Sequence, residues 1–565
     1  PERIAECMRL GWWSGRTVDD ALREAVALAG SREALVDPPN RTALVGGTQR
    51  RLSFAELDAQ VNALASGLLA IGFRKADVLA VQLPNITESV LAFLACARLG
   101  LIFCPISMQF RAHELRYMLV KSRARAALSV RSFKEARPAE VLDGLRREIP
   151  SLERVIVVGE GASISFELDD AMPLRGTAEL LGQYRRDVRV DPNDLLTLCW
   201  TSGTEARPKG VPRSHNHWIA NGEACSELGQ VRSGDPILNP FPMINVASIG
   251  GMVMPWLMNQ AKLVQHHPFD LPIFLSQLQD ERIAYTVAPP AVLTQLLKNE
   301  ALLANTDLSA LRALGSGSAP LAPWMVEGWQ TRFGIAVANI FGSNEGCALF
   351  SLGQDVPDPH DRAQFFPRFG VPGLEWSSGF SSKIRTRLVD LDTGEEITAP
   401  GRPGELRVDG ALRFDGYWDE AELSRAAFDE AGYFRSGDLF EIAGEGARFY
   451  RFIGRAKDII VRGGMKISPA ELDSLIEGHP QIREAAFCGV PDDVLGERIG
   501  IAAVPRPGEI LTLENIVSYL RKLEVAAIKL PEYLQIVEEL PRNSLGKVVR
   551  RDLPARFAAS SSPLP

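Results

Sequence analysis

The sequence is poor in the residues that mark several classes of protein. Seven cysteines are spread over 565 residues with no CxxC pair, which excludes a disulfide scaffold as a description of the whole chain. Basic residues are not in excess, since 62 Lys and Arg against 70 Asp and Glu give a net charge of −8. This balance argues against a general nucleic-acid binder, although it leaves room for a local site that binds a small anion.

Long hydrophobic runs are also scarce. The best candidate for a membrane span is 89–108, SVLAFLACARLGLIFCPISM, but Arg98 lies in its middle and Gly100 and Pro105 interrupt it. A core helix followed by a core strand explains this segment better than a bilayer span. The first 16 residues contain no apolar segment of a signal peptide. We therefore expect a cytoplasmic protein with no membrane span and with reduced, mostly buried cysteines.

The first part of the chain predicts helices that alternate with strands. Ser53 followed by Glu56 is a capping box, and it predicts a helix with Leu57, Val61, Leu64 and Leu68 on its apolar face. A strand at 78–85, a helix near 86–99 and a strand at 101–106 follow. This alternation predicts parallel sheets flanked by helices. From about residue 370 short strands and turn signals predict a β-rich part, and after Asp458 a compact α+β stretch follows.

The segment 198–213, LCWTSGTEARPKGVPR, carries the most informative motif. An apolar strand leads into a small, polar loop and then Lys209; the loop begins with Thr201, Ser202, Gly203 and Thr204. Hydroxyl groups, backbone N–H groups near a glycine and one lysine suit a polyphosphate. The segment is not a Walker loop, which reads GxxxxGK[ST], and taken alone it is equally consistent with a polar surface loop.

This loop resembles the signature TSGTTGxPKG of the adenylate-forming superfamily, which includes acyl-CoA synthetases, nonribosomal adenylation domains and firefly-type luciferases. Glu205 and Ala206 stand where that signature has Thr and Gly. Five further segments resemble the superfamily's motifs in order and spacing, and they are 316–320 (SGSAP), 339–345 (NIFGSNE), 433–438 (YFRSGD), 454–458 (GRAKD) and 541–547 (PRNSLGK). Each segment alone has a bland alternative, such as a turn or a solvated basic tail, but six ordered matches are hard to explain by chance.

The resemblance assigns roles to individual residues. It implies that Lys209, Glu345 and Lys547 are catalytic, that Glu345 also holds Mg²⁺, and that Asp458 is a hinge. It implies an ATP site formed by Thr201, Ser202, Gly203, Thr204, Ser318, Ala319, Pro320, Asn339, Phe341, Gly342, Ser343, Asn344, Asp438 and Arg455. In this site Phe341 would stack on adenine and Asp438 would accept hydrogen bonds from both ribose hydroxyls. Ser318 replaces a common Gly and Asn344 replaces a common Thr.

The same resemblance predicts where the other two substrates bind. Gly463 and Gly464 would line a pantetheine tunnel, because a narrow channel leaves no room for Cβ atoms, although a tight turn between strands fits equally well. The acyl pocket would be formed by Asn245, Ile249, Gly250, Gly315 and Ile340. Its main segment, 241–254, is apolar and lacks the Asp that holds an amino-acid substrate, so an uncharged acyl group is favoured. Ile340 replaces a common Gly, and its bulk points to a medium-length or alicyclic acid rather than a flat aromatic ring.

Together these observations predict an α/β protein with two domains. Residues 1–457 would form a large N-terminal domain of two αβ-type subdomains and a small β-rich subdomain at about 370–457; residues 458–565 would form a small, mobile α+β C-terminal domain that carries Lys547. The expected enzyme is an ATP-dependent acid–thiol ligase that uses ATP, Mg²⁺ and coenzyme A and passes through an acyl-adenylate. An enzyme that loads a separate carrier protein is the main alternative, and a non-catalytic nucleotide-binding relative and a luciferase rank lower. A homodimer is possible, and nucleic acid is not an expected partner.

Overall fold

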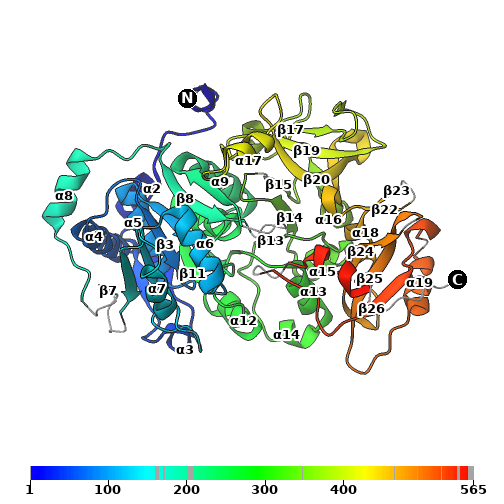
Figure 1. Ribbon diagram of the computed structural model, residues 1–565, viewed down its shortest axis with the longest axis horizontal. Coiled ribbons are helices and arrows are strands. Elements are labelled where there is room, and N and C mark those ends of the chain that lie inside the picture. The colour runs from blue at the N-terminus through cyan, green and yellow to red at the C-terminus, as the bar shows by residue number, and fades with distance from the viewer. Residues whose placement is uncertain are drawn as a thin grey trace.

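The structure is a computed structural model, and it describes all residues except 1, 160–164, 169–171, 202–207, 347, 463–464, 493, 524, 544–546 and 558–565. The described residues form four β-sheets with helices packed against them (Figure 1). Two sheets are mainly parallel and belong to the first 351 residues, one is antiparallel, and the last belongs to the C-terminal part.

The first parallel sheet has seven strands in the order β7-β6-β5-β3-β4-β8-β9. Its strands are β3 (Val78–Gln82), β4 (Ile102–Pro105), β5 (Ala126–Ser129), β6 (Arg154–Val158), β7 (Phe166–Leu168), β8 (Leu195–Trp200) and β9 (Gly210–Ser214). The connecting helices are α4 (Phe54–Ala70), α5 (Thr87–Leu99), α6 (Ala112–Ser122), α7 (Pro138–Arg146) and α8 (Ala178–Asp187). The expected capping box is present, because Ser53 Oγ accepts from Glu56 N–H at 3.3 Å while the Glu56 carboxylate accepts from Ser53 N–H at 2.8 Å.

The apolar run at 89–108 is a buried helix and strand, as predicted. Every residue of α5 is buried, and β4 follows it inside the seven-stranded sheet. The charge of Arg98 is neutralised within the protein, because its guanidinium lies 2.8 Å from Asp19 and 2.7 Å from Asp58. Among the described residues no helix combines the length and the apolar character that crossing a membrane requires.

The second mainly parallel sheet has eight strands in the order β15-β14-β13-β12-β10-β11-β1-β2. Its strands are β1 (Glu33–Val36), β2 (Arg51–Ser53), β10 (Pro236–Asn239), β11 (Lys262–Gln265), β12 (Tyr285–Val287), β13 (Ala313–Gly317), β14 (Val337–Gly342) and β15 (Ala348–Ser351). Its helices include α2 (Val18–Ala29), α9 (His215–Leu228), α12 (Leu271–Asp280), α13 (Pro290–Lys298) and α15 (Pro323–Phe333). The neighbours β13 and β14 are parallel and pair Gly315 with Ala338 and Gly317 with Ile340, so the motif segments that follow both strands leave the sheet at the same edge.

The remaining two sheets are smaller. The β-rich part is a six-stranded antiparallel sheet made of β16 (Phe365–Pro367), β17 (Ile384–Val389), β18 (Glu396–Ile397), β19 (Pro403–Gly410), β20 (Phe434–Ala443) and β21 (Phe449–Arg455). The C-terminal sheet contains β22 (Ile460–Arg462), β23 (Met465–Ile467), β24 (Ile482–Asp492), β25 (Gly496–Pro505) and β26 (Tyr533–Ile536), with α18 (Pro469–Ile476) and α19 (Leu513–Lys522). The predicted α/β class with a β-rich segment and an α+β C-terminal part is therefore confirmed, whereas the boundary at 457/458 stays a prediction.

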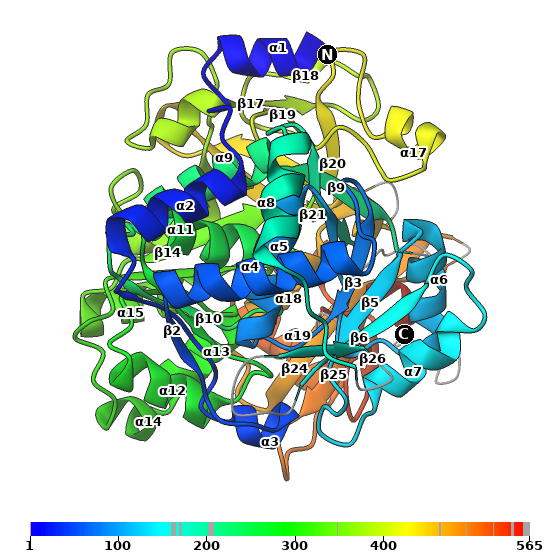
Figure 2. The same ribbon diagram turned by 90° about the vertical axis from the view of Figure 1, so that its left-hand side faces the viewer.

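Figure 1 shows the C-terminal part (orange to red) beside the six-stranded sheet and at the far end from the seven-stranded sheet. Figure 2 shows that the first helix, α1 (Glu2–Arg9), lies along the six-stranded sheet rather than on the parallel sheets that follow it in sequence. Side-chain donors hold this N-terminal arm, residues 2–16, in place: Trp12 Nε1 donates to Ser382 O and Trp13 Nε1 donates to Ala411 O, both at 3.0 Å.

Candidate active site

The phosphate-loop motif begins where β8 ends and stops where β9 begins. Thr201 N–H donates to Lys209 O at 2.9 Å, and Lys209 N–H donates to Thr201 Oγ1 at 3.4 Å, so the two ends of the loop lie side by side. Ser202, Gly203 and Thr204, together with Glu205 and Ala206, lie outside the described residues. Their contact with phosphate stays a prediction, but the position of Lys209 at the base of the loop is fixed by the strand pair.

Glu345 and Lys209 meet at an aromatic ring that belongs to none of the six motif segments. Tyr417 Oη donates a hydrogen bond to Glu345 Oε1 at 3.2 Å, and Lys209 Nζ lies 5.3 Å from the centre of the same ring. The backbone also fixes Glu345, because Phe414 N–H donates to its carbonyl at 2.9 Å. Tyr417 therefore contacts both Lys209, which is predicted to be catalytic, and Glu345, the predicted magnesium ligand. The signal available in the sequence was the aromatic pair 417–418 directly after Gly416, whose φ of +141° favours glycine.

The two asparagines that depart from the usual motifs hold backbone groups. Asn344 Oδ1 accepts a hydrogen bond from Val246 N–H at 2.9 Å, which leaves the amide nitrogen of Asn344 as its donor group. Asn245 caps the short helix α10 (Val246–Ser248), since its Oδ1 accepts from the N–H groups of Ala247 and Ser248. The predicted nucleotide and acyl segments are thus joined directly. The capping bonds also show that the Asn245 amide oxygen is engaged with its own helix.

The residues predicted to bind adenine lie at the ends of β13 and β14 and in the turns that follow these strands. Ser318 has a φ of +73°, a left-handed conformation in which glycine is favoured, and this explains why Ser is unusual in the turn. Ser318, Ala319 and Pro320 are exposed, and Gly342 is exposed at the end of β14. Among the described residues the buried Ser343 hydroxyl has no hydrogen-bond partner.

Phe341 and Asn339 lie on the same strand but have different environments. The Phe341 ring is half-buried and makes an edge contact with Phe440, with ring centres 5.0 Å apart. The side chain of Asn339 is buried, and its Nδ2 donates to the carbonyls of Arg362 (3.2 Å) and Ala363 (2.9 Å). The Asn339 amide nitrogen therefore ties β14 to α16 (Pro359–Gln364) and is already engaged with the backbone of that helix.

Asp438 and Arg455 are cross-strand neighbours in the six-stranded sheet, on β20 and β21. The Arg455 Nε lies 3.4 Å from Asp438 Oδ1, and the Arg455 side chain is about half exposed while Asp438 is buried. Burial raises the pKa of Asp438 from 3.8 to about 6, although Arg455 and Lys547 act in the opposite direction. A buried carboxylate that is only partly neutralised can still accept hydrogen bonds, so Asp438 is suited to bind the two hydroxyls of a ribose.

Lys547, from the C-terminal part, lies within electrostatic reach of this group. The residue keeps exposed surface, but the surrounding protein desolvates its ammonium group; this desolvation and the charge of Arg455 lower the Lys547 pKa below its ordinary value, while Asp438 and Glu345 oppose the shift. Asn543 holds the backbone of Lys547, because its side-chain oxygen accepts from Lys547 N–H at 3.0 Å. The structure therefore brings Lys547 to the predicted nucleotide residues.

The expected hinge lies at the end of β21. Asp458 is the last residue of a short 3-10 turn, η4 (Ala456–Asp458), and its carboxylate lies 4.0 Å from Arg550 in the C-terminal part. Gly463 and Gly464 lie outside the described residues, between the paired strands β22 and β23. The hinge and tunnel roles both stay predictions.

The predicted acyl residues lie in two tightly packed places. Ile249 and Gly250 belong to a π-helical turn, Ile249–Val253, and a Cβ on Gly250 would lie 1.7 Å from the Asn221 side-chain oxygen. A Cβ on Gly315 would lie 2.7 Å from Ile340 Cδ1, so the Ile340 side chain already occupies the space over Gly315. Single π-helical turns are frequent at functional sites.

Two family models match the chain. Residues 31–418 match the family model "AMP-binding enzyme", and residues 471–547 match "AMP-binding enzyme C-terminal domain". The chain is 29% identical over 526 residues to the medium-chain fatty-acid–CoA ligase of Escherichia coli (92% of this chain, 89% of that protein). It is 30% identical over 522 residues to the indoleacetate–CoA ligase of Aromatoleum aromaticum (91% and 95%).

Solved structures share the fold over nearly the whole chain. An anthranilate CoA ligase in complex with anthranoyl-AMP has a TM-score of 0.77 at 21% identity and covers 97% of this chain and 98% of its own. A fatty acyl CoA synthetase of Mycobacterium tuberculosis has a TM-score of 0.67 at 26% identity, with coverages of 96% and 99%.

Proposed function

Since the chain belongs to the AMP-binding enzyme family, as its motifs indicated, we propose that it is an acid–thiol ligase that converts a carboxylic acid to its acyl-CoA through an acyl-adenylate. The observation that carries this proposal is the gathering of charged groups from separate parts of the chain: Lys209, Glu345, Asp438, Arg455 and Lys547. Retention of all five favours a catalyst over a relative that only binds nucleotide.

In the first step a carboxylate oxygen of the acid attacks the α-phosphorus of ATP, and the bond to pyrophosphate breaks. Both reactants are anionic, so positive charge at the reacting centre lowers the barrier. Lys547 acts as an electrostatic clamp and Lys209 holds the phosphates. Asp438 orients the ribose through its hydroxyls, with Arg455 beside it.

The site is also suited to Mg²⁺ bound with ATP. Magnesium is usually held by one or two carboxylates together with substrate phosphates, and Glu345 offers a carboxylate whose orientation is fixed by Tyr417. When bound, the ion would neutralise phosphate charge. Glu345 would hold it, and Tyr417 would keep the carboxylate in place.

In the second step the thiol of coenzyme A attacks the acyl carbonyl, a thioester forms, and AMP leaves with the electrons of the broken acyl–phosphate bond. We infer that the C-terminal part turns about Asp458 between the two steps and withdraws Lys547. The Asp458–Arg550 contact supports a pivot at this place, because it joins the turn to the part that would move.

The acid is proposed to be a medium-length or alicyclic monocarboxylic acid. The segment 241–254 is apolar, and Ile340 shortens the space over Gly315. The names of the relatives agree with an apolar acid, and the indoleacetate–CoA ligase makes an arylacetic acid the second candidate. We further propose a cytoplasmic homodimeric enzyme with coenzyme A rather than a carrier protein as acceptor.

A panel of acids tests this proposal. Hexanoate, octanoate, cyclohexanecarboxylate, indoleacetate, benzoate and malonate are assayed for ATP-dependent pyrophosphate release, with and without coenzyme A. We expect the first three acids to have the highest kcat/KM and malonate to be inactive, because a second carboxylate would be buried without a partner. If no acid supports ATP-dependent turnover, the proposed ligase activity is refuted. If turnover requires a phosphopantetheinylated carrier protein, the carrier protein is favoured over coenzyme A as the acceptor.

A further inference from the structure

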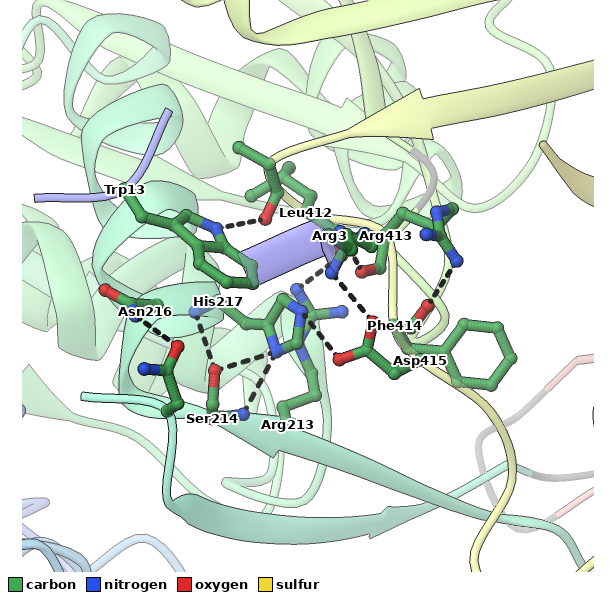
Figure 3. A network of polar contacts seen from close by, with 12 residues as sticks. Arg3, Trp13, Arg213, Ser214, Asn216, His217, Leu412, Arg413, Phe414 and Asp415 are labelled. Carbon is green, nitrogen blue, oxygen red and sulfur yellow. Dashed lines mark hydrogen bonds and ion pairs between the residues drawn. The ribbon is translucent and has the colours of Figure 1, made fainter. Parts of the chain in front are cut away.

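Arg213 is a fully buried arginine at the edge of the candidate site. It lies on β9, four residues after Lys209, and its guanidinium packs over the Trp218 ring at 5.1 Å. Nη1 donates to the carbonyl of Asn344 at 2.7 Å, and Nη2 donates to the carbonyl of Leu412 at 2.9 Å. Figure 3 shows Arg213 below the segment that carries Leu412, Arg413, Phe414 and Asp415.

Burying the positive charge of Arg213 at this position costs free energy of folding. Among the described residues no carboxylate makes an ion pair with Arg213, and its Nε has no hydrogen-bond partner. Burial lowers the pKa of Arg213 to about 10, against the attraction of Glu345 and Asp415. A buried charge without a paired carboxylate is destabilising, and an apolar side chain of similar size would avoid this cost. The stability of the fold therefore does not explain an arginine here.

The two carbonyls that Arg213 binds belong to the two segments that hold Glu345. Asn344 directly precedes Glu345, and the segment 412–417 supplies the Phe414 N–H and the Tyr417 hydroxyl that contact Glu345. The turn after Glu345 presses against the same carbonyl: a Cβ on Gly346 would lie 1.6 Å from Leu412 O. Arg213 thus bridges both supports of Glu345 from inside the protein. An arginine fork can reach two acceptors at once, which a lysine does less well.

We propose that Arg213 is a positioning residue that locks the turn 344–346 to the segment 412–417 and so fixes the Glu345 carboxylate for magnesium-bound ATP. The inference rests on the proposed function, because it assigns Glu345 to magnesium. It goes beyond the proposed function because it names a residue that does not belong to the predicted ATP, acyl or coenzyme A sites.

Binding of ATP at a series of Mg²⁺ concentrations, measured by calorimetry without acid or coenzyme A, tests the proposal. Arg213→Met is expected to weaken magnesium-dependent ATP binding about tenfold, the effect of losing one or two buried hydrogen bonds that orient a ligand. Binding of ATP in the presence of EDTA is expected to change less than twofold, about the scatter of such measurements. Arg213→Lys keeps the charge but spans the two carbonyls poorly, so an intermediate loss is expected.

Arg362 provides a matched control. It is equally buried and also donates to backbone carbonyls, those of Val337, Val356 and Pro357, but it contacts neither support of Glu345. Arg362→Met is expected to lower the melting temperature while leaving the magnesium dependence of the folded protein unchanged.

The possible outcomes separate the inference from the proposed function. If the wild type binds no magnesium–ATP, the proposed function fails. If the wild type binds it and Arg213→Met has the same magnesium dependence, or if Arg362→Met has the same defect, the positioning role is overturned. Should Arg213→Met not fold, Arg213→Lys decides the question, and a wild-type magnesium dependence in that variant overturns the proposal.

Discussion

Replacing Asp438 by Asn is expected to make the protein more stable and less able to bind ATP. The pKa of this buried carboxyl is about 6, against an ordinary value of 3.8, and burial is the main cause. A tenfold change in a proton dissociation constant corresponds to about 1.36 kcal/mol, so keeping Asp438 ionised at neutral pH costs the folded protein about 3 kcal/mol. Asn has nearly the same shape and carries no charge, so it avoids this cost.

The direction in which stability changes with pH follows from the linkage between proton binding and folding. Well below pH 3.8 Asp438 is protonated in both the folded and the unfolded chain, so its burial costs nothing there. Between about pH 4 and pH 6 the unfolded chain is ionised while the folded carboxyl still holds its proton, so the wild type loses stability relative to the variant over this range, and the difference is constant above it. We therefore expect nearly equal melting temperatures of wild type and Asp438→Asn near pH 4, and a melting temperature of the variant that is a few degrees higher at pH 7.5, the size that about 3 kcal/mol gives in a large domain.

The same variant should lose affinity for ATP. A neutral amide cannot accept charge-assisted hydrogen bonds from both ribose hydroxyls, so we expect the KM for ATP to rise by about 10- to 100-fold. For the wild type, ATP affinity is expected to fall as the pH drops below about 6, whereas the variant should show no such dependence.

Thermal unfolding monitored by circular dichroism from pH 4 to pH 8 measures the first effect, and initial rates measure the second. Asp280→Asn, at the exposed end of α12, is the control and should leave both quantities unchanged. A variant that is less stable than the wild type at pH 7.5, or a stability difference that persists at pH 4, would refute the assignment of the cost to the buried charge.

Three further changes test other parts of the site. Lys547→Ala is expected to slow adenylate formation at least about 100-fold while a supplied acyl-adenylate is still converted to the thioester; equal loss of both half-reactions would exclude its assignment to the first step. Ile340→Ala opens the space over Gly315 and should shift the ratio of kcat/KM for decanoate over hexanoate upward about tenfold, and an unchanged ratio would place Ile340 outside the acyl site. Trp13→Ala removes the hydrogen bond to Ala411 O and should lower the melting temperature by a few degrees, as a lost buried contact of about 1–3 kcal/mol does; no change would show that the N-terminal arm does not brace this segment.

Local signals were sufficient to predict the elements that position the site. The capping box at Ser53 and Glu56 marks the start of α4, and the apolar segment around Arg98 could be divided into a helix and a strand because Gly100 interrupts it. Gly100 indeed ends α5 in a left-handed conformation, with φ of +67°. These predictions succeed because the physical cause, a cap or a glycine, lies within a few residues of its effect.

The candidate site was predictable only in part. Charged residues inside motifs, such as Glu345 and Asp438, could be named from the sequence because the segments that carry them resemble the motifs of a known superfamily. Tyr417 was missed because its role depends on two partners, Lys209 and Glu345, that lie far from it in the sequence. Asn339 was named as a nucleotide residue, but its amide is bound by the backbone of α16, which no sequence pattern indicated.

Arg213 shows most clearly why such a residue cannot be found from sequence alone. Its partners are the carbonyls of Asn344 and Leu412, and a backbone carbonyl is the same group in every residue, so no partner side chain signals the contact. In the sequence Arg213 is a charged residue near the end of a strand, where exposure is the ordinary expectation. Only the fold shows that the strand ends inside the protein, next to the two segments that hold Glu345. The arginine and Lys547 both place positive charge near Glu345, but they differ in one respect: Lys547 belongs to the part that we expect to move, whereas Arg213 is fixed in the large domain. Glu345 should therefore remain positioned when Lys547 withdraws, and losing Arg213 should impair the magnesium-dependent binding of ATP, whereas losing Lys547 should impair adenylate formation.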